Sequence, residues 1–441
     1  MEISEFLNED YSDSALYMSY RSLPSFVDGL KNSGRKVVYT IKKSHIKSRM
    51  KVSGLGSEVV KTAGYLHGES SIQGTIITRA RNYCGSNNLP ILDAEGSFGT
   101  RFTPEAAAPR YIFTKPAEVF DKVFVPADDV NLEEQHFEGD LIEPMFYVPT
   151  VPLLFVNGCE GIGVGFANVI LARSLKNMIK AIRLTLEEKK VDKKLFIPSW
   201  NGFRGTVKEL EPNKYEIRGL AEINKNKVKI TELPISWNLS KYIELLKDLK
   251  KKDIIKKYID YSEDDVFSFE VTLSDEEASK SEEEIFVDLG LVETVVENLS
   301  CIDTHNAIKD EFKTPLEVFA AYVNVKKKYL DLRHKSETKR LKDEKAWLDE
   351  QVKFIREVLK GTIDMKKKKS EVEKELKEKK YASIEKLIAM PLYSQNEDKV
   401  KELEAKAKAK SEELKAYMNE TWATLWEKDL QALESCLKEQ K

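Results

Sequence analysis

The sequence predicts an α+β fold of several domains, with a helix-turn-helix region first, a mixed α/β region next and a long pair of helices last. The 441-residue chain is long enough for two to four domains with separate hydrophobic cores. Short amphipathic helices come first, short apolar strands then alternate with helices to about residue 310, and heptad spacing follows. These changes of period along the chain separate the three regions.

The composition indicates a soluble protein with one basic face. Hydrophobic residues make up 41% of the chain and charged residues 33%, and the formal net charge is only −3. Between residues 21 and 51, nine lysines and arginines (21, 31, 35, 36, 42, 43, 47, 49 and 51) accompany a single acid, Asp28. A solvated helix face would normally interleave the two signs of charge. The local excess of positive charge is therefore typical of a face that meets phosphates.

Cysteine usage and hydropathy bear on the compartment. The four cysteines, 84, 159, 301 and 436, lie far apart and form no C-x-x-C pair, which argues against a disulfide framework or a zinc site. The N-terminus is acidic, unlike a secretory signal peptide, and no apolar run approaches the ~20 residues of a membrane span. We therefore expect a cytoplasmic protein with reduced thiols and no membrane partner.

Three helices are expected in the first region. Residues 1–20 are acidic and contain tyrosines, and they are expected to form an arm that docks on a partner, although a frayed terminus fits nearly as well. A helix from about residue 35 is expected to direct Arg35, Lys36, Lys42 and Lys43 outward. Helices over residues 55–66 and 70–84 follow, the second with Arg79 and Arg81 toward solvent. This pattern favours a helix-turn-helix, although other small helical domains share it.

The middle region is expected to contain short strands. Apolar runs over residues 141–149, 150–158 and 158–170 read as strands, and further strands are expected near residues 204–207 and 227–230. The glycines at 161, 163 and 165 do not match the G-x-G-x-x-G dinucleotide motif. The acidic cluster at 282–284 is expected to be a solvated face rather than a metal site.

The last region shows two heptad seams. Leucines, valine and isoleucine at 341, 348, 352, 355 and 359 form the first, and residues 403, 407, 414, 418 and 425 form the second. Gly361 ends the first run, and turns occur near Pro391. The pattern predicts an antiparallel coiled coil with a compact insert at its tip. A coiled coil with a purely structural role fits the same pattern.

One stretch suggests chemistry. Residues 98–114 read FGTRFTPEAAAPRYIFT, in which Arg110 directly precedes Tyr111 in a loop-like context. A tyrosine is a possible nucleophile for a phosphodiester, and a guanidinium is suited to stabilising the charge that develops on phosphorus. Most tyrosines, however, are core or interface residues.

Seven short motifs in the first 112 residues carry a family resemblance. In order they are Leu23-Pro24, Asp28-Gly29-Leu30-Lys31, Arg35-Lys36-Val37, Tyr65-Leu66-His67-Gly68-Glu69, Gly85-Ser86-Asn87-Asn88, Gly96-Ser97-Phe98-Gly99-Thr100-Arg101 and Ala108-Pro109-Arg110-Tyr111-Ile112. Together they resemble the DNA breakage-reunion subunit of type IIA topoisomerases. The sequences of these motifs are closer to those of the eukaryotic enzymes than to those of bacterial gyrase. In length the chain resembles the separate medium subunit of T4-type bacteriophage topoisomerases.

The resemblance implies a domain plan. It implies an N-terminal arm over residues 1–20, a winged-helix domain with the catalytic tyrosine over 21–125, and a tower domain over 126–310. Coiled-coil helices over 311–360 and 396–441 would carry a dimerisation gate, the C-gate, over 361–395. Two copies of the chain would then form a homodimer through this gate.

The resemblance also implies roles for particular residues. Tyr111 would be the nucleophile that forms a 5′-phosphotyrosyl link, and Arg110 would stabilise the transition state. Ile162 would wedge between base pairs, although a core isoleucine in a glycine-rich turn is the plainer alternative. The implied DNA contacts also include Arg21, Lys31, Arg35, Lys36 and His67, and the arginines at 79 and 81 are expected to join them. Leu66 stands where eukaryotic relatives have a further histidine, and Gly74 replaces an acidic residue of gyrase.

The expected activity depends on a partner. The sequence contains no G-x-x-x-x-G-K-[ST] phosphate loop and no convincing D-x-D cluster for a metal. The resemblance implies that Mg²⁺ and ATP are bound by a separate ATPase and metal-binding subunit, in the host cytoplasm if the chain is phage-encoded. We expect relaxation or decatenation of double-stranded DNA. The alternative is a non-catalytic DNA-bending protein; a tyrosine recombinase would need spaced Arg/His/Arg residues upstream of its tyrosine.

Overall fold

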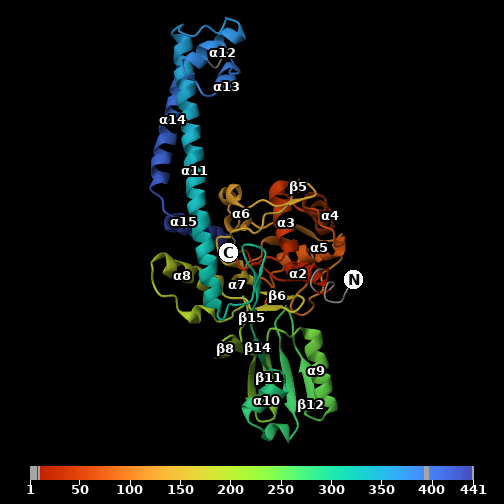
Figure 1. Cartoon of the computed structure of the whole chain (residues 1–441). Coiled ribbons are helices and arrows are strands. Elements are labelled where there is room, and N and C mark those ends of the chain that lie inside the picture. Colours follow the sequence, from red (N-terminus) through yellow and green to blue (C-terminus); the bar gives the residue numbers. More distant parts are fainter. Residues whose placement is uncertain (1–6, 8–9, 392–396, 440–441) are drawn as a thin grey trace. The chain divides into compact units, whose positions relative to one another are not determined.

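The computed structural model describes residues 7, 10–391 and 397–439. The chain divides into two compact units, one of residues 1–326 with 427–441 and one of residues 327–426. Figure 1 shows the elements of each unit. No helix in the described part of the chain has both the length and the apolar composition needed to cross a bilayer.

The first part of the larger unit combines helices with a small sheet. The helices are α2 (Asp10–Ser22), α3 (Asn32–Lys43), α4 (Val52–Ala63) and α5 (Glu69–Ala80). The sheet has the antiparallel order β1-β3-β2, formed by β1 (Met50–Lys51), β3 (Phe113–Pro116) and β2 (Leu92–Glu95). Val59, Ile72 and Ile76 are fully buried where α4 and α5 pack together. The helices predicted at 55–66 and 70–84 both begin and end earlier than expected. Gly64, at φ +58°, ends α4.

A short irregular region follows this sheet. Its elements are α6 (Phe120–Val123), η1 (Pro126–Asn131), β4 (His136–Phe137), β5 (Asp140–Leu141), α7 (Leu153–Asn157), β6 (Cys159–Ile162) and β7 (Ala167–Ile170). The strand expected over residues 150–158 was wrong, because α7 occupies most of it. All of Leu153–Val156 is buried, and a short, wholly apolar run has no alternation that separates strand from helix. Only β5 and otherwise irregular chain occupy residues 141–149.

Two antiparallel sheets dominate residues 204–296. One has the order β14-β9-β8, from β14 (Val292–Val296), β9 (Lys214–Arg218) and β8 (Thr206–Glu211). The other has the order β10-β11-β13-β12, from β10 (Leu220–Asn224), β11 (Lys227–Glu232), β13 (Phe269–Leu273) and β12 (Ile255–Asp260). Helices α9 (Leu239–Lys251) and α10 (Glu282–Asp288) share a buried core with the second sheet (Figure 1).

The remaining small elements complete the larger unit. They are α8 (Leu175–Leu186), η2 (Lys193–Phe196), η3 (Glu277–Ser279), β15 (Asn298–Leu299), β16 (Cys301–Ile302) and β17 (Ile308–Lys309). Strand β15 adds to β7, giving the order β15-β7-β6. A buried ion pair between Arg173 and Glu297, 2.5 Å long, fixes the chain just after β7 to the chain just before β15.

The smaller unit is built on a helix pair. Helix α11 (Pro315–Leu359) has 45 residues, and α14 (Glu397–Met418) runs antiparallel to it. Glu344 pairs with Lys410 at 3.0 Å, and the His334 ring stacks on Tyr417. Between them, α12 (Lys369–Glu378) and α13 (Ile384–Ile388) enclose a small core with Phe354, Ile363 and Leu376.

The second long helix departs from the expectation in one respect. The described part of the segment expected over 396–441, residues 397–439, forms two helices, because α14 ends at Met418 and α15 (Trp422–Glu439) begins with a Thr421 cap. Two predicted seam residues, Leu359 and Met418, are about half exposed and do not join a buried seam. Within the larger unit, Arg183 of α8 binds Glu427 and Glu434 of α15 at 2.9 and 2.8 Å.

Candidate functional site

The Arg110-Tyr111 pair lies on a turn whose backbone is fixed on both sides. Tyr111 N–H donates to Ala108 O at 2.9 Å and closes the turn. The neighbouring carbonyls of Pro109 and Ile112 accept hydrogen bonds from the first two residues of α4, at 3.2 and 3.1 Å. The Ile112 side chain is buried, whereas Tyr111 is 67% exposed. The fold thus anchors the backbone and leaves the phenol accessible.

The Arg110 side chain lies beside the phenol. Its guanidinium carbon is 5.0 Å from the centroid of the Tyr111 ring, and the residue is exposed. No ion pair or hydrogen bond of the Arg110 side chain to another described residue competes for the guanidinium. The Tyr111 hydroxyl and the Arg110 guanidinium are therefore both accessible to an anionic ligand in solvent.

The loop that leads into this turn is braced by two arginines. Arg81 donates to the carbonyl oxygens of Phe98 and Pro104, at 3.1 and 2.5 Å. Arg101 is buried and pairs with Glu232 of β11 at 2.6 Å. The expectation that Arg81 points freely to solvent was wrong, because these loop carbonyls occupy its guanidinium.

Ile162 stands at the end of a β-hairpin. It pairs with Ala167 across β6 and β7, and its side chain is 77% exposed. The glycines on either side lie against α2: a Cβ on Gly161 would lie 2.1 Å from Ser22 O, and one on Gly163 2.8 Å from Ser19 Oγ. Glycines therefore let the hairpin rest on α2 while Ile162 projects away. A core role for Ile162 does not fit this exposure.

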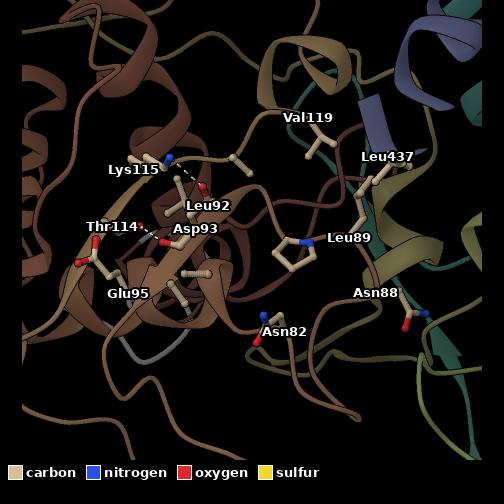
Figure 2. A pocket seen from close by; sticks show the side chains of 14 residues that line it. Asn82, Asn88, Leu89, Leu92, Asp93, Glu95, Thr114, Lys115, Val119 and Leu437 are labelled. Carbon is tan, nitrogen blue, oxygen red and sulfur yellow. Dashed lines mark hydrogen bonds and ion pairs between the residues drawn. The ribbon is translucent and has the colours of Figure 1, made fainter. Parts of the chain in front are cut away.

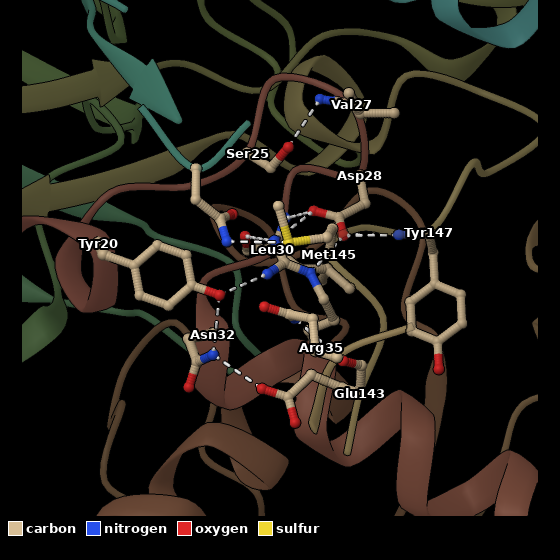
Figure 3. Close-up of polar contacts among 12 residues, drawn as sticks. Tyr20, Ser25, Val27, Asp28, Leu30, Asn32, Arg35, Glu143, Met145 and Tyr147 are labelled. Carbon is tan, nitrogen blue, oxygen red and sulfur yellow. Dashed lines mark hydrogen bonds and ion pairs between the residues drawn. The ribbon is translucent and has the colours of Figure 1, made fainter. Parts of the chain in front are cut away.

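Arg35 and Lys36 do not point outward as expected. Arg35 is 2% exposed, and its Nε donates to Asp28 at 2.8 Å (Figure 3). Lys36 is also buried and pairs with Glu143 at 2.8 Å. Burial alone would lower the pKa of Arg35, but Asp28 outweighs that effect and raises it. Both cations are used inside the protein, so neither faces a phosphate in this structure.

Fewer of the lysines and arginines between residues 21 and 51 are free to meet phosphates than their number predicts. Lys42 pairs with Asp129 at 2.7 Å, and Lys43 donates to Tyr39 at the same distance. Lys31, Arg79 and Arg81 remain together on one groove of about 650 Å³, which Thr75 and Thr78 also line. The Nε of Arg79 is buried without a hydrogen-bond partner. Glu160 lines the same groove.

His67 lies in a separate cluster. Its Nε2 is 2.8 Å from the Tyr17 hydroxyl of α2, and the Arg21 guanidinium lies 5.8 Å from the centre of the Tyr17 ring. Partial burial and the charges of Arg21 and Lys36 lower the pKa of His67. Leu66 is 71% exposed and makes no polar contact of its own. Sequence reasoning missed Tyr17, since no motif links a residue of α2 to the start of α5.

Apart from Ile162 on its hairpin and the buried Arg35 and Lys36, the predicted residues form three groups rather than one cluster. Arg110 and Tyr111 form one, Lys31, Arg79 and Arg81 another, and His67 with Arg21 the third. Among the described residues, no hydrogen bond or ion pair joins Tyr111 to Lys31 or His67. Each group has a member that is exposed or half-buried, so a long ligand could meet several of them, although loop carbonyls already occupy the Arg81 guanidinium.

A further cavity lies beside the sheet of the first region. It has a volume of about 550 Å³ and contains none of the predicted residues. Figure 2 shows Asp93, Thr114 and Lys115 on one side and Leu89, Val119 and Leu437 on the other. Thr114 Oγ1 donates to Asp93 O at 2.7 Å, and Lys115 pairs with Asp93 at 3.6 Å.

The described side chains do not fit a metal site by themselves. Across residues 7, 10–391 and 397–439, no group of three or more His, Cys, Asp and Glu side chains is arranged to hold an ion. The four cysteines are free thiols, and burial raises the pKa of the Cys159 thiol.

The architecture matches a solved class of protein. Over 99% of the chain it superposes on the crystal structure of the Plasmodium falciparum topoisomerase II DNA-binding, cleavage and re-ligation domain, with a TM-score of 0.90 and 30% sequence identity. The match covers 64% of that chain. The fold is thus that of a type II topoisomerase cleavage region.

Sequence comparison gives the family. Residues 21–431 match the family of the A subunits of DNA gyrase/topoisomerase IV, and the chain belongs to it. It is 33% identical over 394 residues to DNA topoisomerase 2-alpha of Sus scrofa and 34% identical over 375 residues to DNA topoisomerase 2 of Saccharomyces cerevisiae. These matches cover 86% and 83% of the chain, which spans only about a quarter (25% and 26%) of the two relatives.

Proposed function

We propose that the chain is the DNA cleavage and religation part of an ATP-dependent type II topoisomerase, an isomerase that relaxes or decatenates double-stranded DNA. The observation that carries the proposal is the exposed Arg110-Tyr111 pair on an anchored turn, in a chain that belongs to the family of gyrase and topoisomerase IV A subunits. The activity requires a transient double-strand break and passage of a second duplex.

The proposed chemistry is a phosphoryl transfer to Tyr111. Its hydroxyl oxygen attacks the scissile phosphorus and gives up its proton, the bond from phosphorus to the 3′ oxygen breaks, and a proton converts the leaving oxygen to a 3′-hydroxyl. The product is a 5′-phosphotyrosyl link. Arg110 stabilises the charge on the phosphoryl oxygens, because a guanidinium is always ionised and can grip two of them. The reverse attack by the 3′-hydroxyl reseals the strand without external energy.

Ile162 is proposed to bend the cleaved duplex. An exposed apolar side chain at the end of a supported hairpin is suited to enter a base-pair step. Unstacking a step costs a few kcal/mol, which the added contact with bent DNA offsets. Lys31, Arg79 and Arg21 would neutralise phosphates along the bent path, and His67 would contact one of them.

The domain plan is proposed on the same basis. Three helices and the β1-β3-β2 sheet support a winged-helix domain over residues 21–125, and the two larger sheets support a tower domain over 126–310. The insert at 361–395, between the helices at 311–360 and 396–441, would be the dimerisation gate of a homodimer. Residues 392–396 lie outside the described part of the chain.

Partner functions complete the proposal. Mg²⁺ and ATP would be held mainly by a separate ATPase and metal-binding subunit, as the resemblance to split enzymes of this family implies. The arm over residues 1–20 would dock on that partner. The likeness to the medium subunit of T4-type phage topoisomerases, and with it a host-cytoplasm location, stays a prediction.

The test is covalent capture. The chain is incubated with DNA, Mg²⁺ and a co-expressed ATPase subunit, and is then denatured with detergent so that trapped intermediates stay attached to DNA. The wild-type chain should give protein–DNA adducts and Tyr111→Phe none. Tyr261→Phe, at a tyrosine that is 58% exposed and far along the chain, should behave as wild type. Adducts that persist in Tyr111→Phe would refute the assignment. DNA bending with no adduct in any sample would favour the non-catalytic alternative.

A further inference from the structure

The His67 imidazole sits between two tyrosines. Its ring centroid is 5.5 Å from that of Tyr65 in an edge arrangement and 6.0 Å from that of Tyr17. The Tyr65 hydroxyl is already used, because it donates to Ser71 Oγ at 2.8 Å. Of these two hydroxyls, that of Tyr17 reaches a ring nitrogen, at 2.8 Å from Nε2.

The sequence neighbours of His67 provide no polar group for this purpose. Leu66 is apolar, and Gly68 has no side chain. The hydroxyl instead comes from α2, fifty residues earlier in the chain. Tyr17 is 51% exposed and lies between Arg21 and His67, both of which are proposed to contact DNA.

We propose that Tyr17 is a positioning residue: its hydroxyl donates to Nε2 of His67 and holds the imidazole in the tautomer that presents Nδ1–H to a DNA phosphate. This inference rests on the proposed function only for the identity of the ligand. A neutral imidazole has one donor nitrogen and one acceptor nitrogen, and the partner of one nitrogen decides the state of the other. A phenol hydroxyl can donate or accept. Because it donates in the proposed arrangement, the proton of the neutral ring lies on Nδ1.

The charges around the ring favour this arrangement. Partial burial, Arg21 of α2 and Lys36 of α3 all lower the pKa of His67, which keeps the imidazole neutral near pH 7. In a neutral ring the choice of tautomer decides whether the group that faces DNA is a donor or an acceptor. A ring nitrogen that is an acceptor would repel a phosphate oxygen. The hydrogen bond from Tyr17 therefore decides whether Nδ1 can donate to the phosphate.

The first experiment measures the tautomer in DNA-free protein. The full chain is labelled with ¹⁵N-histidine, long-range ¹H–¹⁵N correlations are recorded near pH 7.5, and His67 is assigned by the signal lost in His67→Gln. We expect the Nδ1–H pattern in the wild type and its loss in Tyr17→Phe. Tyr11→Phe, a matched change on the same helix, should leave the pattern intact. An Nε2–H pattern in the wild type, or no change in Tyr17→Phe, would overturn the proposal.

The second experiment tests coupling. Tyr17→Phe should lower adduct formation about 2- to 10-fold, the effect of one lost hydrogen bond. In His67→Ala, adding Tyr17→Phe should cause no further loss, because the hydroxyl acts through the imidazole. Additive losses would contradict the positioning role. A wild type that forms no adduct refutes the proposed function instead, and leaves the tautomer measurement standing.

Discussion

The Asp28 carboxylate accepts a 2.8 Å hydrogen bond from Arg35 Nε in a place where both side chains are almost fully buried. The same carboxylate accepts the backbone N–H groups of Leu30, at 2.9 Å, and Tyr147, at 3.1 Å. It thereby joins the chain before α3 to a segment more than a hundred residues later. This pair organises the interior of the region that carries the proposed DNA contacts.

Asp28→Asn should destabilise the protein strongly. The change leaves the Arg35 cation buried without its counter-charge, and loss of one partner of a buried pair typically costs about 3–5 kcal/mol. Urea unfolding followed by circular dichroism measures the effect. Asp93→Asn is the control, because Asp93 and Lys115 are 3.6 Å apart and both about half exposed, so the loss should stay below about 1 kcal/mol. Equal losses in the two variants would contradict the importance of the buried pair.

Arg110→Ala should bind DNA and cleave it slowly. Removing one preorganised group that stabilises transition-state charge typically lowers the rate about 10²- to 10³-fold. Arg110→Lys should recover only part of it, because an ammonium cannot grip two oxygens in a fixed plane. Single-turnover adduct formation measures the rate, with the exposed Lys115→Ala on β3 as control. Cleavage by Arg110→Ala at the wild-type rate would rule out its role.

Ile162→Ala should reduce DNA bending without unfolding the protein. The side chain is 77% exposed, so its truncation leaves no cavity, yet it removes the group proposed to enter the base stack. Fluorescence transfer between dyes at the two ends of a short duplex reports the bend. Val130→Ala, which truncates a similarly exposed side chain, should bend DNA normally. If the two variants bend DNA equally well, the wedge assignment fails.

Lys31→Gln and Arg79→Gln should flatten the salt dependence of DNA binding. Each phosphate contact that is lost should reduce the slope of log affinity against log salt by about 0.9. Lys42→Gln should leave the slope unchanged, because its amine is already occupied by Asp129. Fluorescence anisotropy over a salt series gives the slopes. A slope that is insensitive to Lys31 and Arg79 would show that the groove they line does not meet phosphates.

Local motifs describe the exposed Arg110-Tyr111 turn better than they describe the positions of the buried cations. The Arg110-Tyr111 turn and the glycines around Ile162 are local features, so short motifs describe them, and both tyrosine and isoleucine are exposed as a DNA contact requires. Whether Arg35 and Lys36 are exposed or buried depends on ion-pair partners in other parts of the chain. Glu143 lies 107 residues after Lys36, and a basic residue looks the same in sequence whether its charge is free or paired.

The secondary structure, too, could be predicted where the sequence has a clear local pattern and could not be predicted elsewhere. The long α11 helix and the strands near 206 and 227 follow from sustained periodicity. Helix α7 and the break between α14 and α15 do not, since the first is a uniformly apolar run and the second falls within a continuing heptad pattern. The contact between Tyr17 and His67 has no local signature at all, because it depends on how α2 packs beside the start of α5.

Gly161 and Gly163 pack closely against α2, and this contact couples two parts of the molecule. The helix that supports the Ile162 hairpin through Ser19 and Ser22 is also the helix that holds His67 through Tyr17. A small rotation of α2 would therefore move Ile162 and the His67 imidazole together. The DNA contacts proposed for these two residues would then change together.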